Sequence, residues 1–182
     1  MKPCIPLSRT LHYISFYTTE KLESLHNINI FRLKCLIAED DGTHVDEYNL
    51  ILNMCLHYRK HKKIYLIAVE YIIDDGGREQ GKGDVLLYDG ETLYVVECKC
   101  TCKNPFYTQK RENDVRMQAN KYVDRLTSWI KHLKHIDTTM TKPNTIIGAV
   151  LTEKSKKLVT SCSNQCLAEP LHLTTKFFLF AL

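Results

Sequence analysis

Two strand-like segments joined at Asp89-Gly90 constrain the fold of this chain more than any other feature. Residues 83–88 and 93–100 are rich in Val, Leu and Tyr, as β-strands usually are. Asp-Gly between two such segments is a strong hairpin signal. We therefore expect an antiparallel hairpin with polar residues near its open end.

Three polar side chains share one face of this hairpin, because strand side chains alternate between faces. A two-residue turn places Asp84 diagonal to Glu97, a four-residue turn places them directly opposite, and Lys99 shares their face in both registers. Directly opposed Cβ atoms lie about 4.5–5.5 Å apart, so two carboxylates can share one cation. Oxygen ligands suit Mg²⁺ or Mn²⁺, which polarises a phosphoryl oxygen and activates water. A nearby lysine offsets developing negative charge.

The flanking sequence predicts the order helix, three strands, helix, strand. The helices show apolar residues at helical spacing, and the strands are rich in Ile, Val and Tyr. The expected elements are a helix over 43–60 with Thr43 as its N-cap, strands over 64–73, 83–88 and 93–100, a polar loop over 78–82, a helix over 113–133 and a strand over 145–151. A further strand is expected within 171–182, and the first forty residues are left unassigned.

Length and charge agree with one globular domain that has a polyanionic partner. The 182 residues are 44% hydrophobic, and a core of this size buries roughly 70% of the unfolded surface. The net charge is +4. Between Lys99 and Lys134 there are nine Lys and Arg residues against three acids. That segment is the electropositive part of the chain.

We expect neither a targeting signal nor a membrane span at the two ends of this sequence. Residues 1–13 lack the apolar run of a signal peptide, and the apolar run 177–182 is too short to span a bilayer. We therefore expect an intracellular protein, in the cytoplasm or nucleus, with reduced cysteines and no membrane association.

The hairpin motif resembles that of the PD-(D/E)xK nuclease superfamily. It consists of Gly81-Lys82-Gly83-Asp84, then twelve residues, then Glu97-Cys98-Lys99. Gly83 stands where the family often has Pro. The expected order of elements over 43–151 resembles the family core, an α/β restriction-endonuclease-like fold with a central mixed β-sheet flanked by helices (α-β-β-β-α-β).

A second motif resembles one branch of that superfamily. Gln118 and Tyr122 match the Q-x-x-x-Y pattern of the branch that includes RecB-like nucleases and phage exonucleases. Residues four apart lie on one helix face, so both side chains can point towards one site. The alternative is a surface glutamine beside a core tyrosine.

The resemblance implies a single nuclease-like domain over 1–182, with its core at about 43–151, and a Mg²⁺ or Mn²⁺ cofactor. Asp84, Glu97 and the backbone carbonyl of Cys98 would bind the metal. A further ligand would come from the first helix, with Glu47 as the candidate and Asp46 as the alternative; Glu70 on the first strand is another candidate.

The remaining roles follow from the same resemblance. Lys99 would position the attacking water, and Gln118 and Tyr122 would hold the lysine or the scissile phosphate. Phosphate contacts, which give affinity without sequence choice, would come from basic residues in the electropositive segment. These are Lys103, Lys110, Arg111, Arg116, Lys121 and Arg125. The alternative for them is a solvated helix face.

The expected function is a metal-dependent nuclease that hydrolyses phosphodiester bonds, with DNA favoured as the substrate. One alternative is an RNA endonuclease of the same fold. Another is a non-catalytic nucleic-acid-binding protein that kept the fold. A homodimer or a larger nuclease complex remains open, and no base-reading motif indicates sequence specificity.

Cysteines and histidines offer competing metal sites. Cys98, Cys100 and Cys102 alternate along a strand end, and Cys162 and Cys166 are four apart, yet an iron–sulfur cluster is not expected because free thiols explain them. The pairs His57/His61 and His132/His135 each lie one helical turn apart. Zinc would need two more ligands in each case.

Overall fold

The computed structural model describes residues 5–6, 19–75, 78–99, 109–136, 145–152 and 178–180. Within these ranges the chain has an α/β fold with a mixed sheet in the strand order β1-β2-β3-β4-β5-β6. The strands are β1 (Ile5–Pro6), β2 (Tyr65–Asp75), β3 (Arg78–Tyr88), β4 (Thr92–Lys99), β5 (Thr145–Thr152) and β6 (Phe178–Phe180). The helices are α2 (Thr19–Glu39), α3 (Val45–Lys62) and α4 (Gln109–Ile136).

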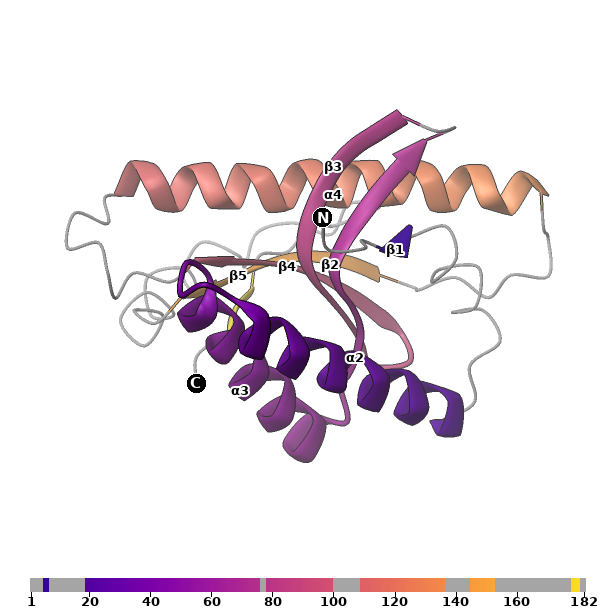
Figure 1. Ribbon diagram of the computed structural model, residues 1–182. Coiled ribbons are helices and arrows are strands. Elements are labelled where there is room, and N and C mark those ends of the chain that lie inside the picture. Colours follow the sequence, from indigo (N-terminus) through magenta and orange to yellow (C-terminus); the bar gives the residue numbers. More distant parts are fainter. Residues whose placement is uncertain are drawn as a thin grey trace.

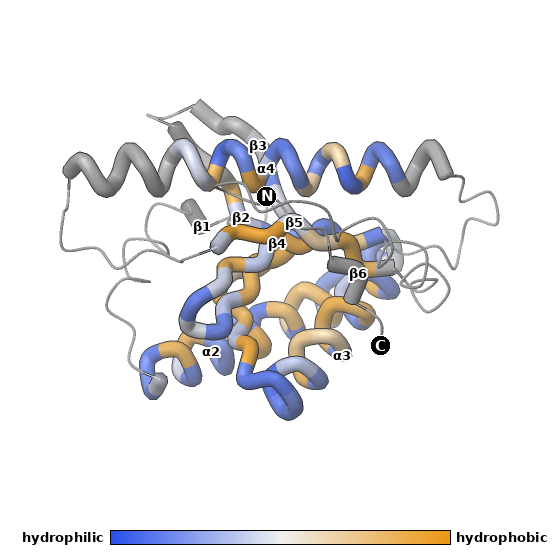
Figure 2. The backbone as a smooth tube through the Cα atoms, turned by 180° about the vertical axis from the view of Figure 1, so that it is seen from behind, coloured by the Kyte–Doolittle hydropathy of each residue, from blue (hydrophilic) through white to orange (hydrophobic). Residues whose placement is uncertain are grey.

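Helices cover both faces of the sheet (Figure 1). Helix α4 lies across one face, while α2 and α3 pack side by side on the other. Side chains of the central hairpin pack on both faces of the sheet. Leu86 and Val95 belong to the cluster that includes Leu126 of α4. Their sequence neighbours Val85 and Val96 belong to the cluster that includes residues of α2 and α3. The strands therefore carry apolar side chains on both faces of the sheet. Figure 2 shows that the residues in the middle of the sheet are hydrophobic.

The central hairpin adopts the four-residue turn. Tyr88 pairs with Leu93, and the Asp89 carboxylate accepts a hydrogen bond of 2.6 Å from the Thr92 backbone N–H. The antiparallel ladder between β3 and β4 ends at Val85↔Val96. Asp84 and Glu97 are consequently the first residues beyond the paired part of the hairpin.

Two polar side chains of α2 form hydrogen bonds with backbone groups in an irregular stretch of β2. The pairing of β2 with β3 shifts register between Leu66 and Ala68. The Leu66 N–H donates to Nδ1 of His26 at 2.9 Å, and the Asn29 amide donates to the Ile67 carbonyl at 2.9 Å. Burial lowers the pKa of His26, which keeps the ring neutral and able to accept. These contacts compensate buried backbone groups that the bulge leaves unpaired.

The predicted elements are confirmed in order and approximate extent, with two corrections. Thr43 is not the helix N-cap; its hydroxyl donates to Asp41 at 2.5 Å, and His44 occupies the cap position without a side-chain hydrogen bond. Residues 78–82 are not a loop but the first part of β3, because the hairpin with β2 extends to Asp75↔Arg78. The predicted tail strand corresponds to the short β6.

The unassigned N-terminal region contains α2, whose apolar residues meet the core. In the parts of the chain described above, no helix combines the length and apolar character needed to cross a membrane.

Candidate metal centre

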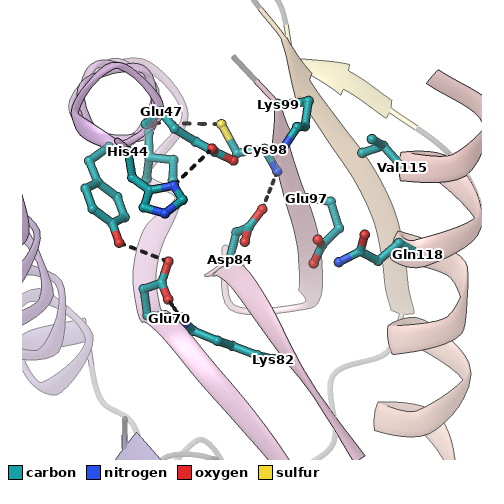
Figure 3. A pocket seen from close by; sticks show the side chains of 12 residues that line it. His44, Glu47, Glu70, Lys82, Asp84, Glu97, Cys98, Lys99, Val115 and Gln118 are labelled. Atoms are coloured by element: carbon teal, nitrogen blue, oxygen red, sulfur yellow. Dashed lines mark hydrogen bonds and ion pairs between the residues drawn. The ribbon is translucent and has the colours of Figure 1, made fainter. Parts of the chain in front are cut away.

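A cavity of about 260 Å³ lies where β3 parts from β4, between the first turn of α3 and the middle of α4 (Figure 3). Its walls carry four carboxylates and two lysines, together with other polar and apolar groups. The lining residues are His44, Glu47, Tyr48, Ile51, Glu70, Lys82, Asp84, Glu97, Cys98, Lys99, Val115 and Gln118. The predicted pair and lysine of the hairpin therefore share one cavity.

Asp84 is fixed against the strand that carries the other motif residues. Its Oδ2 accepts a hydrogen bond of 2.7 Å from the backbone N–H of Cys98. Burial raises the pKa of Asp84 to about 7, the Cys98 hydrogen bond opposes that rise, and the nearby charge of Glu47 adds to it. In an antiparallel strand the N–H and C=O of one residue point towards the same neighbour, so the Cys98 carbonyl also lies on this side.

Glu97 is the most deeply buried carboxylate of the cavity. The residue is 2% exposed, and its Oε1 is buried without a hydrogen-bond partner. Burial and, second, the negative charge of Asp84 together raise the pKa of Glu97 to about 9. Two carboxylates held in this way repel each other unless a proton or a cation lies with them.

Helix α3 contributes Glu47 from its first turn. The Glu47 carboxylate lies 4.0 Å from Nδ1 of His44. Burial raises the pKa of Glu47, and the charges of Lys99 and His44 oppose the rise. Asp46, the alternative ligand, does not line the cavity. The helix thus brings Glu47, rather than its neighbour, to the hairpin carboxylates.

Glu70 lies on β2 across from Asp84, because the flanking pairs are Val69↔Val85 and Tyr71↔Gly83. One oxygen accepts a hydrogen bond of 3.4 Å from the Tyr48 hydroxyl, and the other forms an ion pair with Lys82. The Glu70 backbone has a φ of 50°. This left-handed conformation in a residue with a side chain costs about 1–3 kcal/mol, and such strain concentrates at functional sites.

Of the two residues in the Q-x-x-x-Y pattern, only Gln118 lines the cavity. Its amide donates to the Tyr122 hydroxyl at 3.4 Å, and Figure 3 shows the amide pointing towards Glu97. Tyr122 is buried. Tyr122 therefore contacts Gln118 but is not itself among the residues that line the cavity.

Sequence reasoning missed the reason for the two glycines before Asp84. A Cβ on Gly83 would lie 2.2 Å from Cζ of Tyr71, and a Cβ on Gly81 would lie 2.7 Å from the Tyr122 ring. The Tyr71 hydroxyl is buried without a hydrogen-bond partner. Burial raises its pKa, and the charges of Glu97 and Asp84 raise it further. The Gly-x-Gly spacing was the available signal for aromatic rings packed against this strand.

His44, Tyr48 and Lys82 also line the cavity, although none was predicted to act there. His44, the N-cap of α3, and Tyr48 in its first turn are four residues apart, which places them on the same side of the helix. Lys82 lies two residues before Asp84, so it shares that residue's side of the strand.

The predicted phosphate contacts are only partly within the described structure. Arg116, Lys121 and Arg125 lie on α4; Lys121 is exposed, while Arg116 and Arg125 are half-buried. Arg125 lies close to β3, since its Nη1 would be 2.7 Å from a Cβ on Gly81. Lys110 and Arg111 belong to α4, but their side chains, and all of Lys103, lie outside the described residues.

The oxygen ligands of the cavity are of the chemical type that a hard divalent cation prefers, but they lie too far apart to bind one without moving. Four carboxylates line one cavity, and one of their oxygens, Oε1 of Glu97, has no hydrogen-bond partner. Such oxygens suit Mg²⁺ or Mn²⁺. Among the residues that the structure describes, no group of three or more His, Cys, Asp or Glu side chains is gathered closely enough to hold a metal ion. Cation binding would therefore require the separated carboxylates to draw together.

The other metal hypotheses gain no support from the described residues. Cys35, Cys55 and Cys98 form no disulfide, whereas Cys100, Cys102, Cys162 and Cys166 lie outside the described ranges. The rings of His57 and His61 are 4.6 Å apart, and the side chains of His132 and His135 are not described.

No protein-family model, no curated protein and no solved structure matches this chain.

Proposed function

We propose that this protein is a metal-dependent nuclease with a restriction-endonuclease-like core, which hydrolyses phosphodiester bonds, most readily in DNA. One observation carries the proposal. Asp84 and Glu97 lie beside each other in one cavity with raised pKa values, and Glu97 is 2% exposed. Burial of two ionised carboxylates is costly unless a cation accompanies them.

The partners of the two carboxylates indicate where a cation would bind. Asp84 uses one oxygen for the Cys98 N–H, and Oε1 of Glu97 has no hydrogen-bond partner. A divalent cation between them would take the place of the protons that their raised pKa values favour, and would remove the repulsion. Glu47 and Cys98 line the same cavity, so the Glu47 carboxylate and the Cys98 carbonyl would supply further oxygens once the carboxylates draw together.

The bound cation would supply Lewis acidity, which polarises a phosphoryl oxygen and favours ionisation of water. Asp84 and Glu97 would hold it, and Glu47 would orient water or act as a further ligand. The Lys99 ammonium, at the exposed end of β4, would hold the attacking water and offset the charge that develops on the phosphate. Gln118 would orient the scissile phosphate from α4.

Basic residues of α4 would hold the nucleic acid backbone. Arg116, Lys121 and Arg125 lie along the helix that forms one wall of the cavity. Contacts of this kind read charge and not sequence. Cys35, Cys55 and Cys98 form no disulfide, which agrees with action inside the cell.

The test is cleavage of labelled single- and double-stranded DNA and RNA with Mg²⁺, with Mn²⁺ and with chelator. Wild-type protein should cleave only with metal, and Lys99→Ala and Glu97→Gln should each reduce cleavage by about 10²-fold or more. Lys60→Ala is the matched control: Lys60 is exposed at the far end of α3, about 20 Å along the helix from Glu47.

Each outcome has a distinct meaning. Metal-dependent cleavage that survives Glu97→Gln would remove the hairpin carboxylates from the mechanism. Binding of nucleic acid without cleavage and without metal uptake would instead identify a non-catalytic binding protein.

A further inference from the structure

One carboxylate of the cavity is already neutralised by a side chain. Both oxygens of Glu70 have partners, one in the Tyr48 hydroxyl and the other in the Lys82 ammonium. The Glu70 side chain is 16% exposed and that of Lys82 is 50% exposed. Glu97, by contrast, is 2% exposed and has an oxygen inside the cavity with no hydrogen-bond partner.

Asp84 lies between these two environments. The register of β2 and β3 places Glu70 across from Asp84, and the last paired residues of β3 and β4 place Glu97 across from it on the other side. Figure 3 shows the Asp84 carboxylate between the Glu70–Lys82 pair and Glu97. Asp84 is therefore the residue that cations on either side would share.

The charge of the cavity agrees with one divalent cation. Its walls carry four carboxylates, Glu47, Glu70, Asp84 and Glu97, and two lysines, Lys82 and Lys99. With all of these groups ionised, the side chains sum to two negative charges, which one divalent cation balances. Without Lys82 the sum is three, and the Glu70 side of Asp84 loses its positive charge.

We propose that the Lys82 ammonium occupies the second of two cation positions flanking Asp84. The cavity then takes one divalent cation, on the Glu97 side, and loss of Lys82 opens the Glu70 side to another. This inference deepens the proposed function and rests on its metal site. Lys82 would not contact the bound cation; it would act through its ion pair with Glu70.

The experiment counts bound Mn²⁺ in the full chain after removal of metal by chelation. Isothermal titration gives the stoichiometry, and electron paramagnetic resonance of free Mn²⁺ gives it independently. We expect one Mn²⁺ per wild-type chain, two per Lys82→Met chain, and one again in Lys82→Met/Glu70→Gln. Lys60→Met, on the distant part of α3, should bind one. Circular dichroism checks folding, and Lys82→Gln replaces Lys82→Met if the latter does not fold.

The outcomes separate this inference from the proposed function. One Mn²⁺ in both wild type and Lys82→Met overturns the role of Lys82 and leaves the metal site intact. Two in wild type overturns it as well, because Lys82 would not exclude the second ion. No Mn²⁺ in wild type overturns both, and a second ion that persists in the double variant excludes Glu70 as its ligand.

Discussion

The Asp84 carboxylate accepts a hydrogen bond of 2.7 Å from the backbone N–H of Cys98, the residue between Glu97 and Lys99. The bond forms just beyond Val85↔Val96, where the ladder between β3 and β4 ends. Beyond this point the Asp84 side chain, in place of its backbone, makes the hydrogen bond between β3 and β4. It holds the acid of one strand at a fixed position relative to the acid and lysine of the next.

This bond separates the structural role of Asp84 from its proposed chemical role. Asp84→Asn keeps an oxygen that can accept from Cys98 and should change the free energy of unfolding by less than about 1 kcal/mol, whereas Asp84→Ala leaves a buried N–H unpaired and should cost about 1–3 kcal/mol. Both should lose metal-dependent cleavage. Urea unfolding and a cleavage assay measure the two effects. Equal destabilisation by Asn and Ala would show that the hydrogen bond does not stabilise the fold.

The metal-free protein should become less stable as the pH rises. Burial raises the pKa of Asp84 to about 7 and that of Glu97 to about 9, while unfolded carboxyls titrate near pH 4. Between those values the folded protein binds more protons than the unfolded chain, so the free energy of unfolding decreases with increasing pH. The stabilising contribution is complete below about pH 4 and is lost as the pH passes the folded pKa values.

Thermal unfolding from pH 5 to pH 9, with chelator and with Mn²⁺, measures this dependence. Mn²⁺ should raise the melting temperature more at pH 8 than at pH 5, because the cation competes with protons for the same oxygens. Glu97→Gln should flatten the decrease seen with chelator. A melting temperature that rises steadily with pH in chelator would contradict the raised pKa values.

Gly83→Ala should destabilise the protein by steric conflict with Tyr71. The added Cβ would lie 2.2–2.7 Å from three atoms of that ring side chain, and overpacking of this kind costs about 1–3 kcal/mol. In a Tyr71→Ala background the same substitution should cost much less, since the conflicting atoms are gone. Denaturant unfolding of the two single variants and the double variant gives the coupling. Additive effects would show that Tyr71 is not the obstacle.

Arg125→Ala should weaken DNA binding in a salt-dependent way. Arg125 lies on α4 close to β3, and loss of one phosphate contact reduces the slope of log K against log salt by about 0.9 for duplex DNA. Fluorescence anisotropy at several salt concentrations, with metal replaced by chelator, gives the slope. Lys60→Ala should leave it unchanged. An unchanged slope in Arg125→Ala would place the nucleic acid elsewhere.

The order of elements was predictable because local signals decide it. The Asp89-Gly90 turn, the β-rich segments on either side and the apolar stripe of α4 all act over a few residues. The face shared by Asp84, Glu97 and Lys99 follows from strand alternation alone. The sequence pattern allowed two registers, and the hairpin adopts the one with the four-residue turn. In this turn the Asp89 carboxylate accepts a hydrogen bond from the Thr92 backbone N–H.

Features that depend on long-range packing were not predictable. Residues 78–82 were interpreted as a polar loop, yet they belong to β3, where Gly81 admits a ring from α4 and Gly83 a ring from β2. Tyr48 of α3 and Lys82 of β3 enter the site because both side chains meet Glu70 of β2 there. Thr43 has the side chain of a good N-cap, but Asp41 captures its hydroxyl.

The contacts of α2 with the bulged stretch of β2 have a consequence for the smallest fragment that can fold. His26 and Asn29 reach residues about forty positions away in sequence, and a slip of α2 by one turn, about 5.4 Å, would break both contacts together. A fragment that begins near residue 43 would leave Leu66 and Ile67 with buried, unpaired backbone groups. Helix α2 and the sheet therefore belong to one cooperative unit, whose amide protons should exchange through the same opening event.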